Sequence, residues 1–215
     1  MQLFVSWSGG KDCMLALYRV LHEKQHAVSH LVNMCDIDGL HSRSHGLKKH
    51  LIARQASAIG IEIVQQETDI KNYEANFKLA IDRLKRLGVT GGIFGDIYLQ
   101  PHRDWIERVC AEMEIQPIFP LWNHLTIELV NEFIGLGFKT LTVSVNHQFL
   151  FQSWLGREID NGFVNDILKL EGIDPCAENG EYHSFVYDGP LFKSAVPFVK
   201  VNEYYRDNHW FLELN

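Results

Sequence analysis

Short apolar runs alternate with helical patterns along the first part of the chain. The runs contain β-branched and aromatic residues and are too short for helices, so they predict strands buried on both faces. They occupy residues 2–7, 27–35, 61–64 and 89–94. Between them, apolar residues recur at three- and four-residue spacing, which predicts amphipathic helices. These helices are expected over residues 11–25, 47–59 and 71–87.

This alternation is typical of an α/β fold with a doubly wound, mostly parallel sheet. Ligands of such sheets bind beyond the carboxyl ends of the strands, near the point where the strand order reverses. The loops that follow the first, second and fourth expected strands are therefore the candidate ligand-binding loops. They are residues 8–13, 35–46 and 95–104.

The second part of the chain changes character. Two more amphipathic helices are expected, over 101–114 and 126–136. A strand over 139–145 is expected to extend the parallel sheet. From about residue 146 the periodicity fades, and a short helix around 160–170 precedes a β-rich tail. We therefore expect a nucleotide-type α/β domain over 1–145 and a smaller, mixed substrate domain over 146–215 that folds over its cleft.

The loop after the first strand carries the sharpest chemical signal. Its adjacent glycines, Gly9 and Gly10, let the backbone approach a ligand closely, and the next helix presents unpaired N–H groups and the positive end of its dipole. Two hydroxyls and a cation surround them, from Ser6, Ser8 and Lys11. The spacing fits neither G-x-x-x-x-G-K-[ST] nor G-x-G-x-x-G. It predicts a phosphate site of another kind, with a plain glycine-containing turn as the alternative.

Gly95 and Asp96 follow the fourth expected strand. Gly95 allows close backbone approach, and Asp96 supplies a carboxylate at the ligand edge of the sheet. The alternative for Asp96 is a cap on the next helix. On that helix Arg103 and Glu107 stand four residues apart, so a weak surface ion pair is the simplest explanation for Arg103.

A second polar cluster lies in the segment Cys176 to Phe185. Gly180 can form a turn, and the alternation after it predicts a strand. Glu178, Asn179 and Glu181 would then project from the turn, where they could bind magnesium, hold an amino or ammonium group, or accept a proton. A solvated acidic hairpin turn is the alternative.

Composition and charge exclude several classes of function. The chain has 20 Lys+Arg against 27 Asp+Glu, a net charge of −7, which argues against broad, charge-driven binding to nucleic acid or membranes. Its four cysteines form no C-x-x-C pair, so free thiols in a reducing compartment are expected. With no signal-like segment and no apolar run of about 20 residues, the sequence predicts a soluble cytoplasmic protein.

The stretch Ser8-Gly9-Gly10-Lys11-Asp12 resembles the pyrophosphate-binding SGGxDS loop of the PP-loop ATP pyrophosphatases. The chain has Cys13 where that loop usually has serine, and a thiol is a weaker hydrogen-bond donor than a hydroxyl. Residues 178–192, E-N-G-E-Y-H-S-F-V-Y-D-G-P-L-F, narrow the resemblance to the diphthine–ammonia ligase family and to its bacterial-type branch. Archaeal and eukaryotic members carry E-G-G-E-[FY]-E-T there. Asn179 and His183 depart from that pattern, which leaves the acceptor open.

The resemblance implies a PP-loop, HUP-like fold and an ATP-dependent, amide-forming ligase. A substrate carboxylate would attack the α phosphate, pyrophosphate would leave, and ammonia would displace AMP. ATP and Mg²⁺ are the implied cofactors; a small-molecule or protein-borne carboxylate and ammonia are the implied partners, and a homo-oligomer is left open. The alternatives are a nucleotide sensor without turnover and a PP-loop enzyme of tRNA modification. The second usually requires an acceptor-cysteine pair and a basic surface, and the sequence shows neither.

The resemblance also assigns roles to particular residues. The catalytic set is Lys11, Asp12 and Asp96, of which Asp12 and Asp96 would hold the metal. His45 enters because His45-Gly46 matches an H-G near the nucleotide in the family. The ATP-binding set is Ser6, Ser8, Gly9, Gly10, Lys11, Asp12, Cys13, His45 and Gly95. The substrate-binding set is Arg103, Glu178, Asn179, Glu181 and His183.

Overall fold

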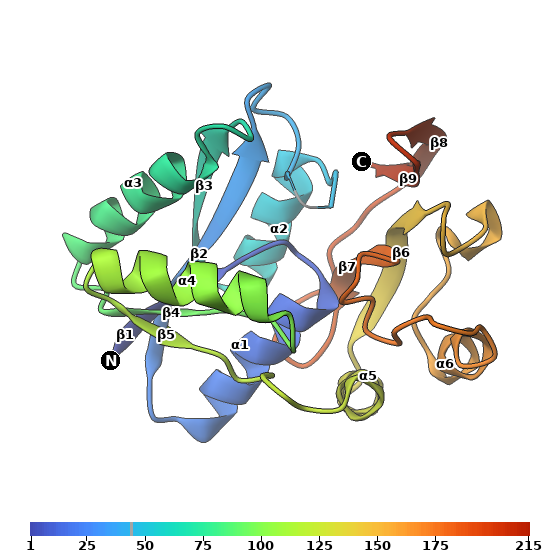
Figure 1. Ribbon diagram of the computed structural model, residues 1–215, viewed down its shortest axis with the longest axis horizontal. Coiled ribbons are helices and arrows are strands. Elements are labelled where there is room, and N and C mark those ends of the chain that lie inside the picture. The colour runs from blue at the N-terminus through green and yellow to red at the C-terminus, as the bar shows by residue number, and fades with distance from the viewer. Residues whose placement is uncertain (44) are drawn as a thin grey trace.

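The computed structural model describes residues 1–43 and 45–215 and contains two β-sheets (Figure 1). The first sheet has five strands in the order β3-β2-β1-β4-β5, and every neighbouring pair is parallel. Its strands are β1 (Gln2–Ser6), β2 (Ala27–Asp36), β3 (Glu62–Thr68), β4 (Gly91–Ile93) and β5 (Gln116–Ile118). The strand order reverses between β1 and β4. The doubly wound α/β fold expected from the sequence is confirmed.

Four helices connect these strands and cover both faces of the sheet. They are α1 (Lys11–Glu23), α2 (Lys49–Ile59), α3 (Tyr73–Lys85) and α4 (Gln100–Glu112). Successive residues of β1 point to opposite faces: Leu3 and Val5 pack with α1 and α2, whereas Phe4 packs with α3 and α4. Burial on both faces is why these strands are continuous apolar runs in the sequence.

The second sheet is antiparallel, with the order β7-β6-β9-β8. Its strands are β6 (Lys139–Asn146), β7 (Tyr182–Asp188), β8 (Lys200–Arg206) and β9 (His209–Leu214). The α-helices α5 (Thr126–Gly135) and α6 (Asn161–Ile167) and a short 3-10 helix, η1 (Gln152–Trp154), accompany it. In Figure 1 this sheet lies beside the first one, with α1 between them. One hydrophobic core runs from α1 through α5 into the second sheet.

The expectation that the strand over 139–145 extends the parallel sheet is wrong. This segment is β6, and it pairs with β7 and β9. A short apolar run shows that a strand is buried, but it carries no information about which strand will be its neighbour. The division of the chain at residues 145 and 146 stays a prediction, and β6 begins ahead of it.

Two simpler expectations concern the cysteines and membrane association. All four cysteines are free and buried. In the part of the chain that the structure describes, no helix has both the length and the apolar character needed to cross a membrane.

Candidate functional site

The loop Ser8–Cys13 joins the carboxyl end of β1 to the first turn of α1, and its two glycines are required by close packing. Gly9 has φ +85°, and a Cβ on it would lie 2.5 Å from Cδ1 of Ile52. A Cβ on Gly10 would lie 2.4 Å from Cε1 of His45. The glycines therefore allow α2 and His45 to pack closely against the loop.

Gln55, a fully buried residue of α2, holds this loop in place. Its side-chain oxygen accepts a hydrogen bond from Nε1 of Trp7 at 2.7 Å, and its Nε2 donates to the carbonyls of Gly9 at 3.0 Å and Val186 at 2.6 Å. Sequence reasoning missed Gln55. Its one signal was a polar residue beside Ala56 on the apolar side of the expected helix.

Strand β7 of the second sheet supports the same loop from the other side. The N–H of Lys11 donates to the hydroxyl of Ser184 at 3.1 Å, and the N–H of Val186 donates to the carbonyl of Gly9 at 3.0 Å. The ring of His45 bonds through Nδ1 to the carbonyl of Ser184 at 2.8 Å. The loop geometry thus depends on a strand more than 170 residues later in the chain.

A cavity of about 510 Å³ opens above the loop. Its walls come from the ends of β1, β2 and β4, the start of α1, and the segment before β7. The lining residues are Ser6, Trp7, Ser8, Asp12, Cys13, Val32, Asn33, Met34, His45, Tyr73, Gly95, Asp96, Leu99, His102, Ala177, Glu178, Asn179, Gly180 and His183. The structure therefore brings together three segments that the sequence singled out separately: 8–13, 95–96 and 178–183.

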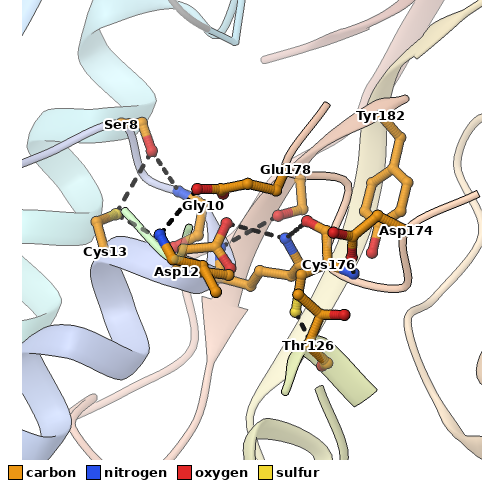
Figure 2. A network of polar contacts seen from close by, with 12 residues as sticks. Ser8, Gly10, Asp12, Cys13, Thr126, Asp174, Cys176, Glu178 and Tyr182 are labelled. Carbon is orange, nitrogen blue, oxygen red and sulfur yellow. Dashed lines mark hydrogen bonds and ion pairs between the residues drawn. The ribbon is translucent and has the colours of Figure 1, made fainter. Parts of the chain in front are cut away.

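Lys11 lies elsewhere than a phosphate-binding role predicts. Its side chain is buried, 4% exposed, and is not part of this cavity wall. Its ammonium donates to the carbonyl of Cys176 and, at 2.9 Å, to the carboxylate of Asp12, and it lies over the ring of Tyr182. Figure 2 shows Asp12, Cys176 and Tyr182 gathered within one network of polar contacts. In this structure Lys11 therefore links α1 to the segment before β7.

Electrostatics keep this buried ammonium charged. Burial opposes the charged form of Lys11, but the Asp12 carboxylate and the polar groups of Tyr182 and Cys176 outweigh it and raise its pKa. Burial raises the pKa of Asp12, and Lys11 works against that rise. The two residues form one ion pair, in which the Lys11 side chain is buried and the Asp12 carboxylate, 32% exposed, reaches the cavity wall.

Asp96 and Gly95 lie opposite Asp12 at the reversal of strand order. A Cβ on Gly95 would lie 2.9 Å from the main chain of Asp12 and Cys13, so this glycine permits direct contact between the end of β4 and the start of α1. Asp96 faces the cavity, with His102 Nδ1 at 3.5 Å. The neighbouring Asp96 carboxylate raises the pKa of His102, against the partial desolvation of its ring. Asp96 is thus a cavity carboxylate, not a helix cap; Leu99 precedes α4.

Glu178 enters the cavity from the segment before β7 and is held by the loop after β4. Its Oε1 accepts hydrogen bonds from the N–H groups of Ile97 at 2.8 Å and Tyr98 at 3.4 Å. Burial raises the pKa of Glu178 to about 7; the bond from Ile97 opposes the rise, and the nearby Asp12 adds to it. A carboxyl group that titrates near neutrality can both take up and release a proton.

Glu181 is a structural carboxylate, and the structure does not bring it to the cavity. It is 0% exposed and accepts hydrogen bonds from the N–H of Asp174 at 3.0 Å, the N–H of Asn179 at 3.1 Å and the side-chain amide of Asn179 at 3.2 Å. Asp174 in turn accepts from the hydroxyl of Tyr98 at 2.7 Å. Glu181 therefore shapes the turn that presents Glu178, while Asn179 stays at the cavity edge.

His45 and His183 form a stacked pair in the cavity wall. Their ring centroids are 4.6 Å apart, with 27° between the planes. Burial lowers the pKa of His45 to about 4, although the bond to Ser184 opposes the shift, and burial lowers the pKa of His183 well below its ordinary value. The two rings are neutral at pH 7 and lie beside the phosphate-type loop.

Arg103 lies outside the cavity wall. Its guanidinium lies over the rings of Phe119 and Trp122, at 4.8 Å and 4.7 Å from their centroids, and its Nε donates to Glu107 at 2.7 Å. The surface-pair interpretation describes this arrangement better than substrate contact does.

His102 and Tyr73 line the cavity, although sequence reasoning did not assign them to the site. Tyr73 was identified only as an apolar position of an amphipathic helix. Such a pattern does not show that the first residue of the helix faces a ligand cavity.

The donor set suits a magnesium ion bound together with phosphate. Among residues 1–43 and 45–215 no group of three or more His, Cys, Asp or Glu residues is arranged to hold a metal. Mg²⁺ commonly takes one or two protein carboxylates and completes its octahedron with phosphate oxygens and water. Asp12 and Asp96, which both line the cavity, match that requirement.

Comparison with protein families gives two matches that together span most of the chain. Residues 1–117 match the diphthamide synthase N-terminal domain, and residues 125–215 match the diphthamide synthase C-terminal domain. The chain belongs to the diphthamide synthase family. The cavity of this family member lies between the two matched regions, since α1 and β4 belong to the first and Glu178 to the second.

Individual relatives are consistent with this family. A diphthine–ammonia ligase of Danio rerio is 27% identical over 154 residues, covering 70% of this chain and 60% of the relative. The diphthine–ammonia ligase of Homo sapiens is 30% identical over 111 residues, covering 50% of this chain and 42% of the relative. The chain thus spans about half the length of the curated relatives it matches. Among solved structures, the U34-tRNA thiolase NcsA from Methanococcus maripaludis matches with a TM-score of 0.39 and 16% identity, over 64% of this chain and 57% of the thiolase.

Proposed function

We propose that this protein is an ATP-dependent ligase that forms an amide from a carboxylate and ammonia and cleaves ATP to AMP and pyrophosphate. The observation that carries the proposal is one cavity, in a member of the diphthamide synthase family, that joins the Ser8–Cys13 loop to Asp96 and Glu178. The acceptor of the named relatives is diphthine. Asn179 and His183 depart from the pattern of the archaeal and eukaryotic members, so we do not assign diphthine as the acceptor of this chain.

The Ser8–Cys13 loop would bind the β and γ phosphates. The N–H groups of Asp12 and Cys13 and the hydroxyl of Ser8 would be the donors, because the N–H of Lys11 already donates to Ser184 and the thiol of Cys13 to the carbonyl of Gly10. Gly10 precedes the helix without a side-chain cap. The thiol of Cys13 also contacts the carbonyl of Gly10 at 3.2 Å and the hydroxyl of Ser8 at 3.5 Å. Held in this way, pyrophosphate is a leaving group in line with attack on the α phosphate.

Asp12 and Asp96 would hold Mg²⁺, which supplies positive charge to the pyrophosphate leaving group when it is bound. Lys11 contributes indirectly: by pairing with Asp12 it fixes the direction of that carboxylate. The acceptor carboxylate would lie beside Asp96 and Glu178, where the end of β4 and the segment before β7 meet the start of α1. Activation of a carboxylate needs position and electrostatic stabilisation more than a protein nucleophile.

Glu178 would serve the second half-reaction. Ammonium must lose a proton before its nitrogen can attack the acyl-adenylate, and a carboxylate with a pKa of about 7 is suited to bind ammonium and accept that proton. Formation of the amide bond then breaks the bond between the acyl carbon and the AMP oxygen. AMP leaves with its charge on the phosphate.

The experiment is product analysis. The protein is incubated with ATP, Mg²⁺, ammonium and a panel of carboxylic acids, and AMP, ADP, pyrophosphate and phosphate are quantified. AMP and pyrophosphate in equal amounts, dependent on both the acid and ammonium, are expected. Production of ADP and phosphate would contradict cleavage between the α and β phosphates, and tight ATP binding without turnover across the panel would favour a nucleotide sensor.

A further inference from the structure

A second pocket, of about 370 Å³, adjoins the main cavity between the first turns of α3 and α4. It shares Ser6, Tyr73, Asp96 and His102 with the main cavity, so the two spaces are continuous through these residues. Its other walls are apolar and mainly aromatic. They come from Phe77, Phe94, Pro101, Trp105 and Ile106.

The aromatic walls are held in fixed orientations. The Trp105 ring centroid lies 5.9 Å from that of Tyr73 and 5.7 Å from that of Phe77. Nε1 of Trp105 donates to Glu74 at 2.9 Å, and Glu74 is also bonded by Arg108. With its one polar atom already paired, Trp105 presents only ring surface to the pocket. A rigid, apolar space of this kind favours flat apolar groups.

The mouth of this pocket is polar, whereas its interior is apolar, so the pocket suits a ligand with one polar and one apolar end. His102 and Asp96 lie there as a pair, at the boundary with the main cavity. The main cavity has about 510 Å³ and already extends from Ser8 to Met34 at the end of β2, which gives the nucleotide room without the aromatic pocket. A ligand that places its carboxylate at the mouth and its body between the rings would use both environments.

We propose that this aromatic pocket binds the apolar body of the acceptor, and that the acceptor is a carboxylic acid carrying an apolar aromatic ring. The proposal rests on the proposed ligase function, because it places the acceptor's carboxylate beside Asp96, where adenylation would occur. Trp105 and Tyr73 would then be determinants of specificity, and His102 would meet the acceptor's carboxylate.

The test is equilibrium binding to the full chain, which does not require turnover. Indole-3-acetate and benzoate are the aromatic probes, and acetate and glutarate are the controls without a ring, measured by calorimetry. The aromatic acids are expected to bind at least tenfold more tightly than acetate. Trp105→Ala should remove this preference, Trp105→Phe should restore most of it, and Trp122→Ala, outside the pocket, should leave it within twofold. Tyr73→Ala serves as a second variant if Trp105→Ala does not fold.

ATP binding is measured on the same variants. An affinity for ATP within threefold of the wild type is expected for Trp105→Ala. Loss of ATP affinity with unchanged binding of aromatic acids would assign the pocket to the nucleotide base and overturn the proposal. Equal binding of acetate and the aromatic acids by the wild type would also overturn it. Failure of the ligase function itself would be recognised separately, by the absence of AMP and pyrophosphate in product analysis.

Discussion

The ammonium of Lys11 donates a hydrogen bond to the main-chain carbonyl of Cys176, 165 residues later in the chain. The same ammonium pairs with Asp12 at the cavity wall. One buried side chain thus couples the start of α1 to the segment that carries Glu178. The site is assembled only when the two halves of the chain are folded together.

Replacing Lys11 by Met is expected to destabilise the protein and abolish AMP formation. The carbonyl of Cys176 and the carboxylate of Asp12 would lose a buried partner, at a cost of about 1–3 kcal/mol in the free energy of unfolding. Urea denaturation measures the loss, and AMP release measures the activity. The control is Lys24→Met, at the C-terminus of α1. Full activity in the folded Lys11 variant would show that neither its charge nor its position is needed.

Asp96→Asn is expected to abolish AMP formation without reducing stability. Asp96 faces the cavity, and the ion pair it makes with the exposed His102 is long, at 3.5 Å. The amide keeps the size of the side chain but cannot serve as an anionic ligand for Mg²⁺. The matched control is Asp104→Asn, an exposed aspartate of α4. Turnover that is unchanged in Asp96→Asn at every Mg²⁺ concentration would remove this carboxylate from the metal site.

Glu178 predicts a pH dependence of the rate. Its pKa of about 7 means that the carboxylate, which would accept the proton of ammonium, becomes populated as the pH rises through 7. AMP formation with saturating ammonium is therefore expected to rise between about pH 6 and 8. Glu178→Gln should lower the rate and remove its increase between pH 6 and 8, whereas the exposed Glu171→Gln should retain this increase. If the rate of Glu178→Gln still increased between pH 6 and 8, the titrating group would be a residue other than Glu178.

The stacked histidines predict a loss of stability in mild acid. Their pKa values are lowered in the folded state, so folding favours the neutral rings; this stabilisation is present above the unfolded value of 6.5 and is lost as the pH falls toward 4. The groups around them add to this effect: His45, His209 and Lys11 disfavour a positive charge on His183, and Lys11 disfavours one on His45, where the carbonyl of Ser184 acts in the opposite direction.

The measurement is the free energy of unfolding from urea titrations between pH 7.5 and 4.5. The wild type is expected to lose up to about 1.4 kcal/mol per pH unit for each ring that resists protonation. His45→Gln should flatten this slope, and the exposed His124→Gln should not. An identical slope in His45→Gln and the wild type would contradict a neutral, half-buried His45.

Much of the first sheet and of its ligand edge could be predicted from the sequence. The apolar runs specified β1 and β2, because burial on both faces leaves a continuous apolar stretch. The glycine pair specified a loop that a ligand can approach, because Gly9 has a positive φ and both positions are closely packed. The Gly95-Asp96 and Glu178 segments were also recognisable, since polar groups at strand ends and turns stand out from their neighbours.

Only the tertiary structure decided how these segments meet. It paired β6 with β7 and β9, directed Lys11 away from the cavity toward Cys176, buried Glu181 and placed Arg103 on Phe119. It also formed the aromatic pocket at Trp105. The physical reason is that a sequence pattern records whether a residue prefers burial or water, whereas its partner depends on residues far away in the chain that packing brings within hydrogen-bonding distance.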